Sequence, residues 1–184
     1  MAILLLENGT IHSDLVDIAR ELSPLGIYLT HYESSTSGFL ADLLSQEILT
    51  DKEKNYILES HNSLFAFLKK EKGYVGNDLL AVHPGLPYLD TLIATCSSYH
   101  THTAPEALYV LSGNIIFGFV QPDGQQVQII LHPQDYIHIP AGVEHWLSPT
   151  ASLHCKAVRY LTIMEGCIPY YTGTQKSDFL RKQR

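Results

Sequence analysis

The second half of the chain, from about residue 79, is built of short β-rich runs that follow one another at near-regular intervals. Turn-forming pairs such as Pro84-Gly85 and Ser112-Gly113 separate these runs. Many short strands with turns between them favour an all-β barrel or sandwich over alternating strands and helices. We predict strands at Leu79–Val82, Leu92–Thr95, Tyr109–Leu111, Ile115–Val120, Val127–Leu131, Tyr136–Ile139 and Ala157–Ile163.

The first part of the chain has mainly helical patterns, although Ala2–Leu6 and Ile27–Tyr32 resemble strands. Ser13 is the expected N-cap of a helix of about ten residues. A capping box that begins at Thr50 predicts a longer second helix, which runs until Gly73. We therefore predict a mainly β fold in a single domain, residues 1–184. In this domain a helical elaboration of about 1–75 precedes a β-barrel of about 79–175.

The composition limits the function classes that the chain can serve. With 184 residues, 45% of them hydrophobic, it can bury the core of one domain. The net charge of −7 and an isoelectric point near 5.7 argue against a nucleic-acid partner, because a phosphate backbone attracts a basic face. No apolar run approaches the roughly 20 residues that span a bilayer, so we expect no membrane partner. Cys96, Cys155 and Cys167 cannot all pair, which favours free thiols in a reducing cytoplasm.

Four residues could converge on one metal ion. His100 and His102 point to the same face of a strand, because successive side chains alternate. Glu106 keeps the same parity if the strand resumes after Pro105, and His145 would come from a second strand across the barrel. Three imidazoles and one carboxylate leave two positions open in an octahedral shell, which suits a chelating substrate.

Taken alone, a His-x-His pair is more often a surface or chance pair than a metal site. Here the pair is followed by further residues at fixed offsets, and the two blocks resemble the two motifs of the cupin superfamily. The first motif, His-x-His-x3-Glu-x6-Gly, is matched at His100, His102, Glu106 and Gly113. The second is matched at Pro140, Gly142 and His145, while Gln134 and Pro149 replace its first Gly and last Asn. The resemblance implies a double-stranded β-helix barrel with a metal at its centre.

A narrower resemblance covers most of the chain. The blocks Lys72-Gly73-Tyr74, Asp78-Leu79, His100-Thr-His102, His145-Trp146, Ala157-Val158-Arg159, Glu165-Gly166 and Tyr171-Thr172-Gly173 are similar to those of the acireductone dioxygenase family. The resemblance implies one metal ion per chain, held by His100, His102, Glu106 and His145. It also implies oxidation of acireductone (1,2-dihydroxy-3-keto-5-methylthiopentene) by dioxygen in methionine salvage. With Fe²⁺ the implied products are 4-methylthio-2-oxobutanoate and formate; with Ni²⁺ they are methylthiopropionate, carbon monoxide and formate.

Three positions near the expected chemistry depart from the family pattern. Leu108 stands where an active-site Arg is expected, Tyr99 where a Glu is usual, and Cys167 where a Trp is common. Arg159 is a candidate to take over part of the missing cation's role, although a structural ion pair is an equal alternative. Trp146 is a second candidate for the wall of the substrate site.

The departures keep two other readings open beside the dioxygenase. One is a different cupin enzyme that acts on another chelating small molecule. The other is a catalytically weakened cupin that binds a metal or ligand only. For the assembly we expect a monomer or a small homo-oligomer.

Overall fold

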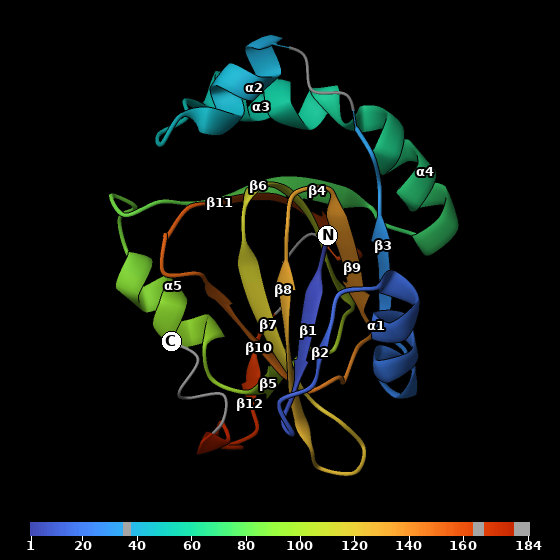
Figure 1. The fold of residues 1–184 in the computed structure, drawn as a ribbon. Helices are drawn as coiled ribbons and strands as arrows, with labels where there is room; N and C mark the ends of the chain where they lie inside the picture. Colours follow the sequence, from blue (N-terminus) through green and yellow to red (C-terminus); the bar gives the residue numbers. More distant parts are fainter. Residues whose placement is uncertain (35–37, 164–167, 179–184) are drawn as a thin grey trace.

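Two antiparallel sheets face each other in the computed structural model, which describes residues 1–34, 38–163 and 168–178 (Figure 1). The larger sheet has the strand order β12-β5-β10-β7-β8-β1-β2, and the smaller one β3-β9-β6-β11-β4. The first sheet is formed by β1 (Ile3–Leu6), β2 (Ile11–His12), β5 (His100–Thr101), β7 (Ile115–Val120), β8 (Gln126–Leu131), β10 (His145–Pro149) and β12 (Tyr170–Tyr171). The second is formed by β3 (Tyr28–His31), β4 (Gly76–Val82), β6 (Glu106–Gly113), β9 (Asp135–Ile139) and β11 (Cys155–Leu161). The predicted mainly β class is confirmed.

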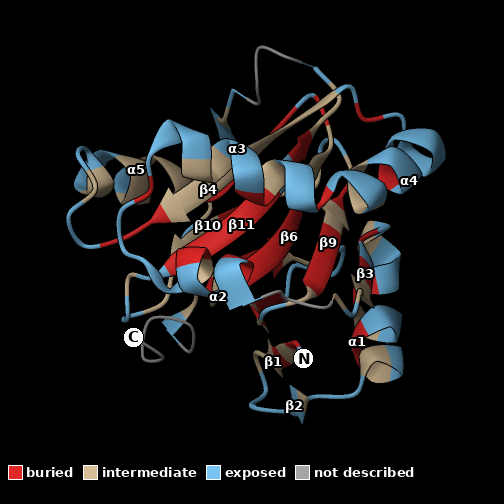
Figure 2. Ribbon diagram, turned by 90° about the horizontal axis from the view of Figure 1, so that it is seen from above, coloured by how far each residue is buried: buried red, intermediate tan, exposed pale blue. Residues whose placement is uncertain are grey.

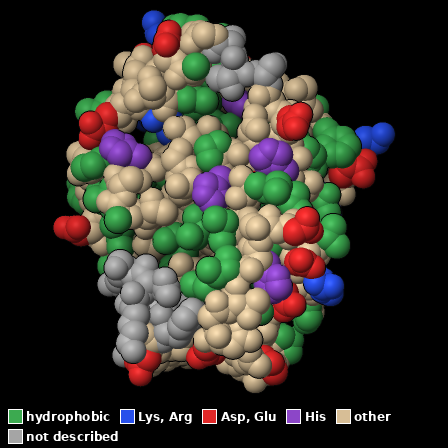
Figure 3. Space-filling view, viewed as in Figure 1, with side chains coloured by type: hydrophobic (Ala, Val, Ile, Leu, Met, Phe, Trp, Pro, Cys, Tyr) green, Lys and Arg blue, Asp and Glu red, His purple; other side chains and the backbone are tan. Residues whose placement is uncertain are grey.

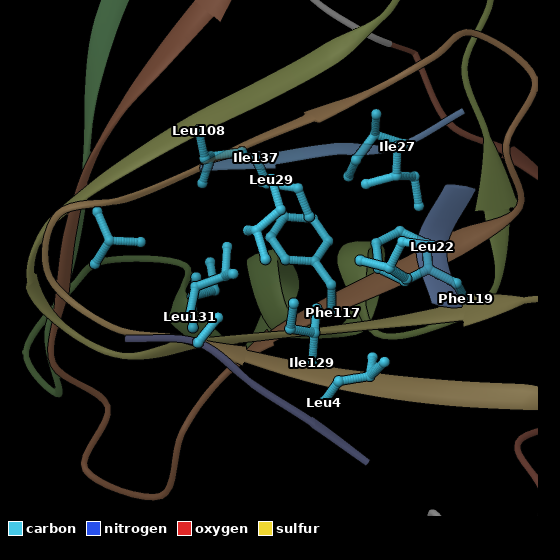
Figure 4. Packing of buried hydrophobic residues seen from close by; sticks show 14 of the residues in the cluster. Leu4, Leu22, Ile27, Leu29, Leu108, Phe117, Phe119, Ile129, Leu131 and Ile137 are labelled. Atoms are coloured by element: carbon cyan, nitrogen blue, oxygen red, sulfur yellow. The ribbon is translucent and has the colours of Figure 1, made fainter. Parts of the chain in front are cut away.

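The main core lies between the two sheets. Alternate residues of β7, such as Phe117 and Phe119, point inward and are fully buried. Figure 4 shows them packed against Ile129 of β8 and against Leu108 and Ile137 of the opposite sheet. The strand alternation that the sequence shows thus encloses one apolar interior, and the metal-site residues lie at its edge.

Helices cover the outer face of the smaller sheet (Figure 2). They are α2 (Gly38–Ser45), α3 (Asp51–Ser60) and α4 (Asn62–Lys72), while α1 (Leu15–Leu22) and the 3-10 turn η1 (Ser23–Leu25) lie beside β3 and α5 (Leu89–Cys96) beside β10. None of the helices in the described ranges is long and apolar enough to cross a lipid bilayer. On the face drawn in Figure 3, basic side chains lie singly among scattered acidic ones.

Several sequence predictions need correction. The run Leu92–Thr95, predicted as a strand, belongs to the helix α5. Its apolar residues Leu89, Leu92, Ile93 and Cys96 recur at helical spacing, and a short apolar run does not by itself distinguish the two structures. The N-cap of α1 is Asp14 rather than Ser13, because its carboxylate accepts from the amides of Val16 and Asp17.

The predicted capping box at Thr50 is confirmed, but the helix that it starts ends at Ser60. The chain turns at His61, and α4 continues as a separate helix to Lys72. The helix α2 was not predicted. The N-terminal part also supplies strands, because β1 pairs with β8 and β3 pairs with β9. The strands predicted at Ala2–Leu6 and Ile27–Tyr32 are thus observed as β1 and β3, and the part expected to be a helical elaboration also extends both sheets.

A second, tyrosine-rich core fills the space between the helices and the smaller sheet. The hydroxyls of Tyr74 and Tyr136 lie 2.6 Å apart, and Tyr74 also hydrogen-bonds His138 Nδ1 at 2.7 Å. Burial raises the pKa of Tyr74 from 10.0 to about 12, and burial raises the pKa of Tyr136 and Tyr160 as well. These phenols therefore stay neutral in the folded chain at pH values where the unfolded chain ionises.

The raised tyrosine pKa values predict a loss of stability in alkali. Above pH 10 the unfolded chain releases phenolic protons that the folded chain retains, so the free energy of unfolding falls as the pH rises toward 12. Each such tyrosine contributes a slope of about 1.4 kcal/mol per pH unit. Urea unfolding between pH 8 and 11 measures the slope. We expect it to be smaller in Tyr74→Phe and unchanged in Tyr88→Phe, whose parent side chain is exposed. Equal slopes in the two variants would contradict the assignment.

Candidate metal centre

Two neighbouring strands of the larger sheet and one strand of the smaller sheet bring the predicted ligands together. His100 lies in β5 and His145 in β10, and the two are direct partners across the antiparallel pair. Partners in such a pair project to the same side of the sheet, which places both imidazoles in the barrel. His102 follows β5, and Glu106 is the first residue of β6. His100 and His102 thus lie on the same side, as the alternation of side chains along a strand predicts.

The donor atoms lie at distances that suit one ion. The ligand nitrogens of His100, His102 and His145 all lie within 4.8 Å of one another. Glu106 Oε2 is 2.9 Å from His145 Nε2 and 3.6 Å from His102 Nε2. Two ligands in adjacent positions, each about 2.1 Å from an ion, are separated by about 3 Å. The three histidines thus form a metal-binding triad that leaves room for the carboxylate beside it.

Backbone carbonyls orient the three imidazoles. His100 Nδ1 donates to Ser98 O at 2.7 Å and His145 Nδ1 to Val143 O at 2.8 Å. His102 Nδ1 donates to Ile168 O at 3.1 Å. Because Nδ1 of each ring is engaged with a carbonyl oxygen, Nε2 is the nitrogen left to face a metal ion, which is the arrangement usual for metal-binding histidines.

The electrostatics of the site suit a cation. Burial is the main cause that lowers the pKa of His100, so its ring is neutral and its lone pair available. Burial alone would raise the pKa of Glu106, but the hydrogen bond from His145 and the charges of the three histidines outweigh it and lower that pKa. The site therefore offers three imidazole nitrogens and one carboxylate, a donor set that Fe²⁺ and Ni²⁺ both accept.

The ligands open onto a cavity of about 240 Å³. Its walls are mostly apolar. They come from β4, α5, β7, β10 and the segment that begins at residue 168. The lining residues are Leu80, Val82, Leu92, Ile93, Thr95, Cys96, His100, His102, Glu106, Ile115, Leu147, Pro149, Arg159 and Pro169. The cavity can hold a small molecule with an apolar part beside the donor set.

Arg159 is the cationic side chain of this wall. It lies in β11 directly opposite Leu108 of β6, so the two side chains share the inner face of the sheet. Its guanidinium binds Asp78 of β4 in bidentate fashion, with Nε–Oδ1 and Nη2–Oδ2 distances of 2.8 and 2.6 Å. Leu108 itself is fully buried in the main core. Arg159 thus forms the predicted ion pair and also lines the cavity, while its role toward a substrate stays a prediction.

Two other predicted positions face away from the cavity. Trp146 alternates with His145 on β10, packs on Gly118 and lies beneath the ammonium of Lys176. The structure therefore does not bring Trp146 to the cavity wall where we expected it. Tyr99 is buried on the side opposite His100, and its hydroxyl donates to Gln126 Oε1 at 3.1 Å. The departure from the family pattern at Tyr99 does not touch the donor set.

Sequence reasoning missed one side of the cavity. Cys96, which we expected only as a free thiol, lines the cavity from α5. Burial, together with the charge of Glu106, raises the pKa of its thiol to about 11, so the sulfur stays protonated near neutral pH. Helical spacing from Leu89 to Cys96 was the signal that could have placed it there. Glu165, Gly166 and Cys167, which also entered the sequence argument, lie outside the described residues.

Known proteins resemble this chain over nearly its whole length. The model of the ARD/ARD′ family matches residues 26–168. An acireductone dioxygenase from Trichormus variabilis is 62% identical over 182 residues, which cover 99% of this chain and 100% of that protein. A second acireductone dioxygenase, from Leptospira biflexa, is 36% identical over 81% of this chain and 86% of its own.

A solved structure agrees with these relatives. The acireductone dioxygenase from Bacillus anthracis with a cadmium ion in its active centre superposes with a TM-score of 0.85. It is 26% identical and covers 93% of this chain and 98% of its own. A small β-barrel whose strands bring three histidines together around one point defines a metal-binding protein of the cupin class, as predicted. Within that class, the chain belongs to the ARD/ARD′ family.

Proposed function

We propose that the protein is an acireductone dioxygenase whose single metal ion is held by His100, His102, Glu106 and His145. The observation that carries the proposal is the convergence of these four side chains on one point beside a cavity that Arg159 also lines. The relatives named acireductone dioxygenase support the substrate, a small enediol, and dioxygen as its co-substrate. The reducing cytoplasm, where Cys96 stays a thiol, is the proposed location.

The residues divide the work of the reaction. When bound, the metal supplies a Lewis acid and a template that brings the vicinal oxygens of the enediolate next to dioxygen. The three histidines and Glu106 hold that ion and leave adjacent positions for substrate. Arg159 offsets the negative charge of the enediolate from across the cavity. The apolar side chains of Leu92 and Leu147 enclose the remainder of the substrate and exclude water.

Oxygen uptake with acireductone tests the proposal. Protein loaded with Fe²⁺ should consume dioxygen well above the rate of the metal-free protein, and product analysis should find the keto acid and formate. Both Fe²⁺ and Ni²⁺ accept this donor set. We propose iron as the working metal and nickel as the ion that gives the alternative products. Metal analysis of the purified protein decides between the two. Uptake no faster than the metal-free background would reject the dioxygenase.

The alternative is a cupin that binds metal but turns over acireductone poorly. The observation that favours it is Leu108, which fills with hydrocarbon the position next to Glu106 on the inner face of β6. A full complement of metal, substrate binding and no oxygen uptake would support this alternative.

Arg159→Met is expected to lower kcat/KM by about tenfold to more than a hundredfold, the effect of losing a charge-assisted contact of about 1.5 to 3 kcal/mol. Arg159→Lys keeps the charge but not the planar fork, so its loss should be smaller. Steady-state oxygen uptake measures both. Arg20→Met is the matched control, since Arg20 forms an exposed ion pair with Asp17 on α1. If Arg159→Met retained the parent kcat/KM, Arg159 would be only a partner of Asp78.

A further inference from the structure

The last described stretch of the chain, residues 168–178, lies along the edge of the larger sheet; we call it the C-terminal strap. Its strand β12 pairs with β5, so that Tyr171 lies opposite His100 and Tyr170 opposite Thr101. The amide of Thr172 then donates to Tyr99 O at 3.1 Å. Figure 1 shows this short red strand beside β5 at the end of the barrel. The strap is therefore a strand partner of the segment that carries His100 and His102.

One end of the strap touches the metal centre. Ile168 O accepts the hydrogen bond from His102 Nδ1, and Pro169 lines the cavity. The ring of Tyr171 meets that of His100 edge-on, with centroids 6.1 Å apart. The position of the strap thus sets which nitrogen of His102 carries the proton, and it supports the ring of His100.

The other end of the strap is held by two hydrogen bonds to one buried side chain, beside the contact of Lys176 with Trp146. Gln126 of β8 donates from Nε2 to Gln175 O at 2.8 Å and accepts at Oε1 from the amide of Ser177 at 2.8 Å. The same Oε1 accepts from the hydroxyl of Tyr99 at 3.1 Å. Gln126 is 8% exposed and Tyr99 is 1% exposed. Buried hydrogen bonds of this kind are costly to break, because the partners that remain cannot reach water.

Gln126 and Tyr99 are not among the residues that line the metal cavity. Gln126 reaches that site by two routes, through the strap and through Tyr99, which directly precedes His100. A chain of contacts runs from Gln126 to Gln175, along the strap to Ile168, and from there to His102. Each step is a hydrogen bond or a covalent connection.

We propose that Gln126 and Tyr99 form a latch that fixes the C-terminal strap and thereby positions His102 and His100 for metal binding. Both are positioning residues, and the proposal rests on the proposed metal site. Release of the latch frees the strap, the carbonyl of Ile168 leaves His102, and the imidazole loses its preferred tautomer. Loss of such an outer partner usually costs about 10- to 100-fold in metal affinity, and we expect about tenfold here because the latch acts through the strap.

The test compares Gln126→Leu and Tyr99→Phe with the control Gln121→Leu. Gln121 Nε2 also donates to a backbone carbonyl, that of Glu21 at 3.2 Å, but it holds α1 instead of the strap. Ni²⁺-loaded proteins are mixed with a chelator that changes colour on binding nickel, and the release rate is recorded without substrate. Because no turnover is measured, the result does not depend on which substrate the enzyme oxidises.

We expect release to be about ten times faster in Gln126→Leu, less accelerated in Tyr99→Phe, and unchanged in Gln121→Leu. The ¹⁵N NMR signals of His102 should show mixed tautomers in the metal-free Gln126→Leu protein and one tautomer in the control. If Gln126→Leu fails to fold, Tyr99→Phe, which removes only a hydroxyl, decides. Parent-like release from the folded latch variants, or equal acceleration in Gln121→Leu, would overturn the proposal.

Discussion

His145→Ala is expected to leave the folded protein almost without metal and to reduce oxygen uptake to the metal-free background. The substitution removes one nitrogen donor directly. It also removes the partner that lies 2.9 Å from Glu106 and lowers the pKa of that carboxyl. The remaining carboxylate is buried with less compensation, so the donor set is weakened twice. The loss of metal affinity should therefore be larger than the loss of about 10- to 100-fold that is typical when a residue that hydrogen-bonds a metal ligand is replaced.

Metal content after dialysis and oxygen uptake measure this result together. The control is His154→Ala, which removes an exposed histidine at the start of β11 outside the cavity. We expect the control to bind one ion per chain and to keep the parent rate. A His145→Ala protein that retained a full equivalent of metal would show that another residue holds the ion.

Gly113→Ala is expected to be the most destabilising single-methyl change in the barrel, by about 2 to 5 kcal/mol. Gly113 ends β6 with a φ of 71°, a backbone conformation that is strained in any residue with a side chain. A Cβ at this position would also lie 1.9 Å from the backbone oxygen of His154. His154 directly precedes β11, which is hydrogen-bonded to β6. Its oxygen therefore cannot move without disturbing the hydrogen bonds between the two strands. The backbone strain and the steric overlap therefore both contribute to the expected loss of stability.

The overlap can be separated from the strain by a second glycine. Gly124 has a φ of 85°, but a Cβ there would meet nothing within 4 Å. Gly124→Ala should therefore cost only the conformational part, about 1 to 2 kcal/mol. Urea unfolding curves of the two variants measure the difference. Equal losses would mean that the neighbouring strand yields to the added methyl group.

The sequence predicts the strands of the barrel well where alternation is long and turns are marked. The run Ile115–Val120 is observed with the predicted bounds, with Phe117 and Phe119 facing the core. The prediction is wrong at Leu92–Thr95, where a short, mostly apolar run fits either structure and the packing of α5 against β10 decides. A strand or turn was expected at His145, but the run His145–Pro149 was not itself predicted as a strand, because it carries no β-branched residue and is held by its pairing with β7.

The metal centre could be predicted because its information is local. Parity places His100 and His102 on one face, and a second block supplies His145. The surroundings of the centre could not be predicted, because they depend on distant pairings. The opposition of Arg159 and Leu108 follows from the register of β11 on β6, and the contact of His102 with Ile168 spans 66 residues. Trp146 faces away from the cavity for a local reason, the alternation along β10, which the prediction for that residue overlooked.

The pairing of β1 with β8 has a consequence for biosynthesis. The first strand of the chain is ordered only when residues near 130 are available, and His102 finds its backbone partner only when residue 168 has been made. Such long-range contacts form late, after the cost of closing large loops. During translation His100 and His102 emerge well before the partners that orient them. We therefore expect the site to bind its ion only after these pairings have formed, so that the available metals compete for an assembled site.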